Sequence, residues 1–286
     1  SNARISSAGV FSHAEGNGTL TIGKASHAEG KFTTSSGNYS HAEGFLSVAG
    51  RRASHAEGNS TSASAAYSHT EGILTKTYGH HSHAEGATSR TYGEGAHAEG
   101  EFTLASGSYS HAEGKGTIAQ KDYSHAEGIN TRTSGSFGAY SHVEGYYSLA
   151  SAQNAHAEGY SSDATGFMSH AEGKNTIASA FYSHAEGSGS KADGNSSHAE
   201  GKKTEALAVR SHTEGVFTKA TGVESHAEGH HNITVGYGSH AEGLRNTSSA
   251  EYSHTEGEKT KTFGEHSHAE GYLTITVAGA DYSHAE

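Results

Sequence analysis

The sequence predicts an all-β fold, a parallel β-solenoid built from about 20 coils with a 14-residue repeat. The first observation is a pentad of the form Ser-His-Ala-Glu-Gly, whose histidine recurs with a fixed 14-residue period along most of the chain. A fixed period of this kind is the signature of a repeat architecture. The second observation is composition: only 32% of the 286 residues are hydrophobic and 39 are glycine. A thick apolar core and long helices are therefore both unfavourable.

The spacing of the pentad histidines changes at two places. The 14-residue period holds from His13 to His125, and a 17-residue step then leads to His142. The 14-residue period resumes as far as His268, and a 16-residue step reaches His284. The chain thus has 20 pentads, each with a glutamate two places after the histidine. A coil of this length is too short for a helical hairpin, which needs about 33 residues, so each coil is expected to hold two short strands and two turns.

Alternation along the strands assigns the side chains to faces. In the pentad strand, the small residues are expected to face inward, and the histidine and glutamate outward. In the second strand, Thr103 and Ala105 are expected inward, and Phe102 and Leu104 outward. The glycine that ends each pentad, such as Gly114, is expected to supply the positive φ of a turn. The predicted lumen is narrow and filled by alanine, serine, threonine and glycine, whose hydroxyls bond the backbone or one another.

The outward histidines and glutamates keep their places in every coil, whereas the outward residues of the second strand vary. A thin roll has little hydrophobic stabilisation of its own, so we expect the constant face to be buried in a homotrimer. There the two rows would form a structural interface ladder. We also expect each glutamate to raise the pKa of neighbouring histidines above about 6.5. Representative members of the two rows are His13, Glu15, His41, Glu43, His69, Glu71, His111, Glu113, His125, Glu127, His142, Glu144, His184, Glu186, His226, Glu228, His268 and Glu270.

Histidine and glutamate on one face are also metal ligands, and the pentad contains the residue types of a hydrolase triad. Twenty ions about 4.8 Å apart would repel one another strongly. The adjacent serine and histidine of a pentad point to opposite faces of a strand, so they cannot share a proton. The sequence therefore predicts no catalytic residue, no cofactor and no metal site, and a chain that is not an enzyme.

The 17-residue step, residues 129–141, breaks the uniform surface. Interruptions of this kind are common positions for recognition in repeat proteins. The candidate ligand-binding residues in the step are Arg132, Phe137 and Tyr140. A bulged turn without a binding role is the alternative.

Composition excludes several classes of stabilisation and of partner. The chain has no cysteine, and its net charge of −12 is not concentrated in a basic patch, so neither disulfides nor nucleic-acid binding is expected. No apolar run is long enough to cross a membrane, so no membrane contact is expected within this fragment.

Residues 1–3 match the scar of a removed expression tag. Residues 4–286 are expected to form one β-roll repeat domain, interrupted at 129–141 and cut from a longer protein.

Residues 110–119 read Ser-His-Ala-Glu-Gly-Lys-Gly-Thr-Ile-Ala. This pattern resembles the 14-residue head repeat of trimeric autotransporter adhesins of the YadA type, whose pentad is Ser-Val-Ala-Ile-Gly. The following Ser/Thr, Ala and Gly fall in register, and the resemblance covers nearly all of residues 8–286. Histidine and glutamate, such as His41 and Glu43, replace the two apolar residues of the family pentad. The resemblance implies a single-stranded left-handed parallel β-roll that forms a trimeric rod.

The resemblance also implies a function. It is that of a fibrous adhesin head on the bacterial cell surface, which displays a binding surface for host extracellular matrix or cell receptors. The expected partners are further copies of the chain and a matrix protein or a cell-surface glycan. Similar rolls occur in phage tail fibres. The alternative is therefore a virion tail-fibre or spike segment that supports a receptor-binding or glycan-cleaving module.

Overall fold

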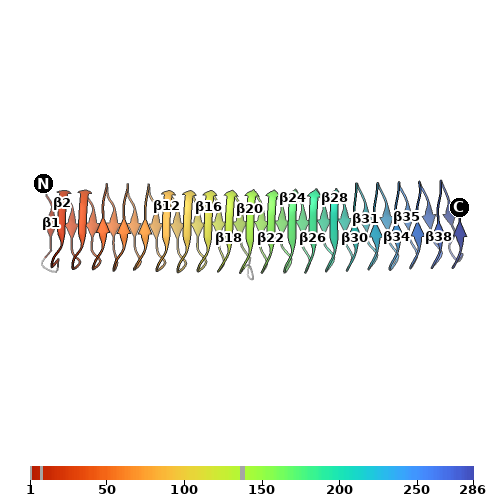
Figure 1. Cartoon of the computed structure of the whole chain (residues 1–286), viewed down its shortest axis with the longest axis horizontal. Helices are drawn as coiled ribbons and strands as arrows, with labels where there is room; N and C mark the ends of the chain where they lie inside the picture. The colour runs from red at the N-terminus through yellow and green to blue at the C-terminus, as the bar shows by residue number, and fades with distance from the viewer. Residues whose placement is uncertain (1, 7–8, 136–138) are drawn as a thin grey trace. The chain divides into compact units, whose positions relative to one another are not determined.

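The computed structural model describes residues 2–6, 9–135 and 139–286. In these ranges every regular element is a β-strand, and the strands form a parallel β-solenoid of about 20 coils, as predicted (Figure 1). The chain divides into two units, residues 1–146 and residues 147–286. Among the described residues, no helix has the length and apolar character needed to cross a membrane.

Each coil contributes one pentad strand and one second strand. In the first unit the pentad strands are β2 (His13–Asn17), β4 (His27–Lys31), β6 (His41–Ala42), β8 (His55–Ala56), β10 (His69–Thr70), β12 (His83–Ala87), β14 (His97–Glu101), β16 (His111–Lys115), β18 (His125–Ile129) and β20 (His142–Tyr146). The second strands of this unit are β1 (Arg4–Ile5), β3 (Leu20–Thr21), β5 (Thr34–Ser35), β7 (Val48–Ala49), β9 (Ser62–Ala63), β11 (Lys76–Thr77), β13 (Arg90–Thr91), β15 (Leu104–Ala105), β17 (Ile118–Ala119) and β19 (Arg132–Thr133).

The second unit repeats this arrangement. Its pentad strands are β22 (His156–Tyr160), β24 (His170–Lys174), β26 (His184–Ser188), β28 (His198–Lys202), β30 (His212–Thr213), β32 (His226–Ala227), β34 (His240–Ala241), β36 (His254–Thr255), β38 (His268–Ala269) and β40 (His284–Ala285). Its second strands are β21 (Leu149–Ala150), β23 (Asp163–Ala164), β25 (Ile177–Ala178), β27 (Lys191–Ala192), β29 (Glu205–Ala206), β31 (Lys219–Ala220), β33 (Ile233–Thr234), β35 (Thr247–Ser248), β37 (Lys261–Thr262) and β39 (Ile275–Thr276).

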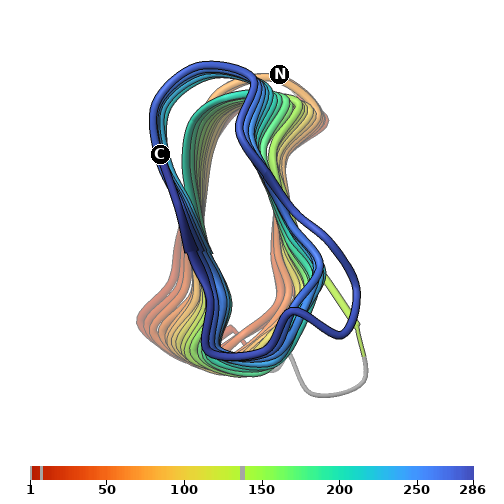
Figure 2. The same ribbon diagram turned by 90° about the vertical axis from the view of Figure 1, so that its right-hand side faces the viewer.

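Pairing within each unit is parallel and in register, so identical residues lie above one another. Between β14 and β16, for example, His97 pairs with His111 and Glu99 with Glu113. Viewed along the solenoid, a coil consists of two extended segments joined by two turns (Figure 2). Because the register is conserved, every position of the coil becomes a column of stacked residues within its unit.

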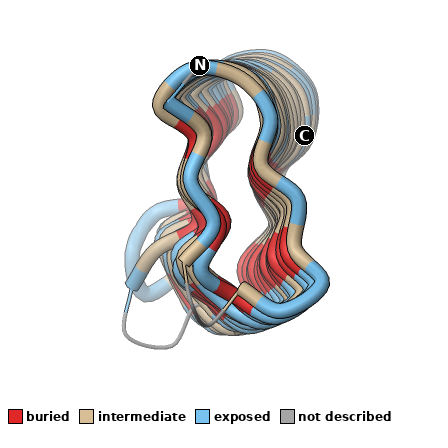
Figure 3. The backbone as a smooth tube through the Cα atoms, turned by 90° about the vertical axis from the view of Figure 1, so that its left-hand side faces the viewer, coloured by how far each residue is buried: buried red, intermediate tan, exposed pale blue. Residues whose placement is uncertain are grey.

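The lumen is filled by small side chains, as the alternation predicts. Ala105 and Ala112 are fully buried, Thr103 and Ser110 are 1% exposed, and Phe102 is 57% exposed. The buried positions recur at the same places in successive coils (Figure 3). The fold therefore has no thick apolar core, and its interior is mainly alanine, threonine and serine.

The hydroxyls of the lumen bond as expected, to the backbone and to one another. Ser110 Oγ donates to the carbonyl of Gly107 at 2.6 Å. Thr133 Oγ1 donates across the lumen to Ser124 Oγ at 2.9 Å. Other hydroxyls, such as Thr117 Oγ1, are buried without a hydrogen-bond partner among the described residues. Interior hydroxyls are thus of two kinds, those with a hydrogen-bond partner and those without one among the described residues. The first kind stabilises the fold, whereas the second costs free energy.

The glycine that ends the pentad has the predicted positive φ. Gly114 has φ 108°, and a Cβ on it would lie 2.2 Å from the carbonyl oxygen of Gly128 in the next coil. No side chain can occupy that space without moving the backbone. The close approach of successive coils therefore requires glycine at this column.

Two further columns of left-handed residues lie at the turns, and the sequence reasoning missed them. Phe102 has φ 59° and Tyr109 has φ 55°, although large side chains disfavour this region by roughly 1–2 kcal/mol. Each donates its amide to the preceding coil, Phe102 N to Ala87 O at 2.9 Å and Tyr109 N to Glu94 O at 2.7 Å. These bonds hold the conformation, together with the stacking of the Tyr109 ring on that of Tyr123. Glycine or asparagine at the equivalent position of other coils could have indicated the left-handed conformation from the sequence. Gly116 and Asn130, in the column of Phe102, are examples.

Candidate functional site

The outward histidines and glutamates of the pentad strands form one continuous surface in each unit, which we call the pentad face. In the first unit, the rings of His55 and His69 are parallel to within 4°, with centroids 4.7 Å apart. In the second unit, His212 and His226 lie 4.6 Å apart with an angle of 6° between their planes. This stacking follows from parallel strands spaced about 4.8 Å apart in register.

Many glutamates lie within 4.0 Å of the histidine of their own pentad, because residues two apart share a face. His83 Nε2 lies 3.5 Å from Glu85 Oε2. Most of these contacts are too long for a hydrogen bond, so the rows are in ion-pair range rather than tightly bonded. The predicted pairs that approach within 4.0 Å are His13 with Glu15, His41 with Glu43, His111 with Glu113, His125 with Glu127, His142 with Glu144, His184 with Glu186, His226 with Glu228, and His268 with Glu270. His69 and Glu71 lie in the same columns.

The Nε2 atoms of many pentad histidines are buried. Those of His83, His111 and His184 have no hydrogen-bond partner among the residues that the structure describes. The side chains are nonetheless about one-third exposed, since the remainder of each ring faces outward. A buried polar nitrogen without a partner is unfavourable, so this face favours the approach of a further group.

Burial lowers the pKa of several pentad histidines. For His83 the pKa falls to about 4, because burial and the stacked His69 and His97 disfavour the charged ring more than Glu71 and Glu99 favour it. The expectation that glutamates raise the histidine pKa is therefore wrong. The sequence shows which charges are neighbours but not how far each imidazole is desolvated. The histidines with a lowered pKa from burial include His27, His55, His111, His125, His184, His212, His226 and His254.

The candidate residues of the 17-residue step lie on different elements. Arg132, in β19, donates from Nη2 to Gln120 Oε1 at 3.1 Å. Tyr140 is 56% exposed, and its ring stacks on that of Tyr123 at 5.1 Å. Phe137 lies outside the described residues. Both described side chains thus extend columns that run through ordinary coils.

The step itself does not disturb the pentad face. His125 pairs with His142 across it, and their rings stack at 4.9 Å. Tyr140 N donates to Asp122 O at 3.1 Å, which repeats the contact of Tyr123 N with Ser108 O one coil earlier. The regular bonding between coils is therefore restored before the next pentad begins.

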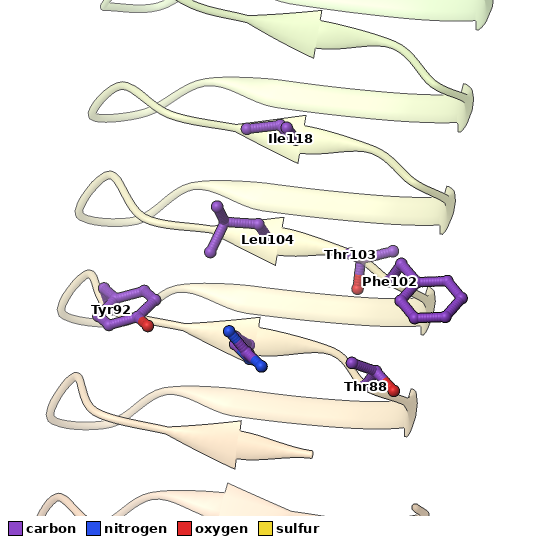
Figure 4. Close-up of a pocket in the computed structure, with 7 residues that line it drawn as sticks. Thr88, Tyr92, Phe102, Thr103, Leu104 and Ile118 are labelled. Atoms are coloured by element: carbon purple, nitrogen blue, oxygen red, sulfur yellow. The ribbon is translucent and has the colours of Figure 1, made fainter. Parts of the chain in front are cut away.

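The outward side of the second strands, which we call the variable face, carries shallow grooves that the sequence reasoning did not identify. One groove in the first unit has a volume of about 300 Å³. Tyr92, Leu104 and Ile118 contribute to it from three successive coils (Figure 4). The groove is lined by Thr88, Arg90, Tyr92, Phe102, Thr103, Leu104 and Ile118. A similar groove in the second unit includes Phe217, Lys219 and Ile233. The sequence feature that could have indicated these grooves is the occurrence of large residues at the same position of neighbouring coils, such as Leu104 and Ile118.

The pentad does not assemble a hydrolase triad within one strand. Ser110 is buried and its hydroxyl bonds a backbone carbonyl, whereas His111 faces outward. Comparison with known proteins adds no family, since neither a protein-family model nor a curated protein sequence matches this chain.

Proposed function

We propose that this chain is the head of a fibrous adhesin on a bacterial surface, in which three copies associate through the pentad face. The observation that carries the proposal is the contrast between the two outer faces. The pentad face presents the same imidazole and carboxylate in coil after coil, whereas the variable face changes from Leu104 to Ile118 to Arg132 in three successive coils.

Association through the pentad face is supported by its half-buried state. The side chains of His111 and Glu113 are 34% and 44% exposed in the single chain. Burying them against two further copies would give the orphaned Nε2 atoms polar neighbours and add buried area along the solenoid, whose own lumen is thin. Such an interface repeats with the coil, so it requires the same residues in every coil.

The variable face supplies the binding surface in this proposal. It carries exposed aromatic and aliphatic side chains beside single cations, as in the groove that contains Arg90, Tyr92 and Phe102. Aromatic residues and arginine are enriched where proteins bind one another. We propose an extracellular matrix protein or a cell-surface glycan as the ligand. The extended array of shallow grooves favours contact over several coils.

Light scattering on the purified chain tests the assembly. We expect a mass three times the 29.5 kDa of one chain. Reversing charges on the pentad face, with Glu99→Arg, Glu113→Arg and Glu127→Arg together, should reduce the mass to that of one chain. Reversing Glu94, Glu251 and Glu265, which are exposed at turns, should leave the trimer intact. A wild-type mass of one chain at micromolar concentration would overturn the proposed assembly.

Binding to immobilised matrix proteins and to arrayed glycans tests the adhesin role. Saturable binding that is lost when the groove residues Arg90 and Tyr92 are replaced with alanine supports it. Absence of binding to every matrix protein and glycan by a correctly assembled trimer contradicts it.

A further inference from the structure

Histidine and glutamate donors converge in a regular way on the pentad face of the first unit. Each group consists of the histidine and glutamate of one coil and the histidine of the next, with one ligand atom from each residue. In every group these atoms lie within 4.8 Å of one another. Five consecutive groups are His55–Glu57–His69, His69–Glu71–His83, His83–Glu85–His97, His97–Glu99–His111 and His111–Glu113–His125.

We propose that these groups bind zinc, each ion being held by two histidines of successive coils and the glutamate of the first. Two imidazoles and one carboxylate form a known ligand set for four-coordinate Zn²⁺, in which water takes the fourth position. The Nε2 atoms of all six histidines in this run are buried and have no hydrogen-bond partner among the described residues. With the ring proton on Nδ1, the lone pairs of these Nε2 atoms are free of hydrogen bonds to the described residues.

Binding requires only side-chain movement. Zn–N bonds of about 2.0–2.1 Å place tetrahedral ligand atoms roughly 3.4 Å apart, so donors now up to 4.8 Å apart must close by roughly an ångström. The glutamate is already near this distance, since His83 Nε2 lies 3.5 Å from Glu85 Oε2. The gap to close is between histidines of successive coils, whose rings stack 4.7 Å apart at His69 and His83, and rotation about the two side-chain bonds of each histidine can tilt the rings together. The backbone can stay in place, because each group draws its donors from strands that are already paired.

The sharing of histidines limits how many ions can bind. His69, for example, belongs to two consecutive groups, so an ion in one group removes a ligand from the next. Neighbouring ions are then at least two coils, about 9.6 Å, apart, which weakens the repulsion that argued against a fully occupied row. The run from His55 to His125 can therefore hold at most three ions per chain. The donors of each group come from one chain, so a single chain can bind the ions.

Equilibrium dialysis of the untagged, EDTA-treated protein against ZnCl₂, with metal analysis by mass spectrometry, tests the proposal. The double variant His83→Ala/His111→Ala breaks four of the five groups, and we expect it to bind two ions fewer per chain. The matched control His80→Ala/His81→Ala removes two neighbouring histidines outside the pentad face and should bind as many ions as the wild type.

Two further measurements keep the test independent of folding. Glu85→Gln and Glu113→Gln lie in two of the three groups that can be filled together and preserve shape. They should weaken zinc binding by about tenfold at those groups, with an unchanged thermal midpoint of the metal-free protein. Cobalt in place of zinc should give the visible absorption of a tetrahedral site, and excess calcium should not displace it. Zinc uptake that is equal in the wild type and the double variant, or lost equally in the His80/His81 control, would overturn the proposal. Light scattering on the same samples reports trimer formation separately.

Discussion

The imidazole rings of His97 and His111 lie parallel, with an angle of 1° between their planes and centroids 4.8 Å apart. Two charged rings at this separation would repel by roughly 3 kcal/mol at an effective dielectric near 20. From His41 to His125 in the first unit, and from His170 to His254 in the second, each histidine of the column has a stacked neighbour on both sides. The pentad face is therefore a stack that favours neutral imidazole.

The stability of the metal-free protein should depend on pH through this stack. The pKa values of His83 and His226 are lowered to about 4 in the folded chain, whereas unfolded histidine titrates near 6.5. Between these values the unfolded chain binds more protons, so the free energy of unfolding falls as the pH falls from about 6.5 towards 4. The contribution is fully present above pH 6.5. Thermal melts in EDTA-containing buffer should show a midpoint that rises from pH 4 to about 6.5 and then levels off.

Replacing histidines of the column provides the control for this pH dependence. The variant His83→Gln/His226→Gln should show a shallower rise, whereas His80→Ala should match the wild type. A midpoint that falls as the pH rises from 4 to 7 would mean that the folded chain keeps its histidines charged.

The glycine that ends the pentad should be indispensable. Gly114→Ala places a Cβ 2.2 Å from a backbone carbonyl at φ 108°, and we expect a loss of at least about 3 kcal/mol in the free energy of unfolding. Gly116→Ala is the matched control, because its φ of 67° suits the left-handed region and its nearest contact is the movable side chain of Asn130. It should lose about 1 kcal/mol. Denaturant unfolding curves measure both, and equal losses would contradict the close approach of the coils.

The two kinds of lumen hydroxyl should respond oppositely to removal. Thr117→Val deletes a buried hydroxyl without a hydrogen-bond partner among the described residues, and we expect it to stabilise the fold by about 1 kcal/mol. Thr133→Val deletes a hydroxyl that donates to Ser124 and accepts from the amide of Gln120. It should destabilise the fold by about 1–2 kcal/mol. Both variants replace threonine with valine and so change shape in the same way. If chemical denaturation shows that both stabilise or both destabilise the fold, then shape rather than hydrogen bonding determines the change in the free energy of unfolding.

If the variable face binds ligand over many coils, affinity should fall gradually as coils are removed. Phe102→Ser/Ile118→Ser, in the groove of the first unit, should weaken binding several-fold, measured by surface plasmon resonance. His184→Ala lies on the pentad face and should leave affinity for the ligand unchanged. Complete loss of binding from that one substitution would indicate a discrete site instead.

The sequence predicted the columns well because alternation in a strand has a strict period of two. The inward alanines and the outward rows of His111 and Glu113 followed directly from it. The left-handed turns were missed because residues such as Tyr109 and Phe102 normally avoid positive φ. The lowered histidine pKa was missed because it depends on depth of burial, which a residue pattern does not give. The grooves of the variable face depend on how different side chains pack against one another between coils. The 14-residue period does not determine that packing.

The two irregular steps occur at the same corner of the coil. After the 17-residue step His142 still stacks on His125, and after the 16-residue step His284 still pairs with His268. The additional residues lie after Thr133 in one coil and after Thr276 in the other, before the tyrosine that precedes the next pentad. This corner therefore accepts extra chain without a change of register on either side. Foreign peptides could therefore be inserted at this corner of a chosen coil. The 14-residue repeat would then set the spacing between inserted peptides.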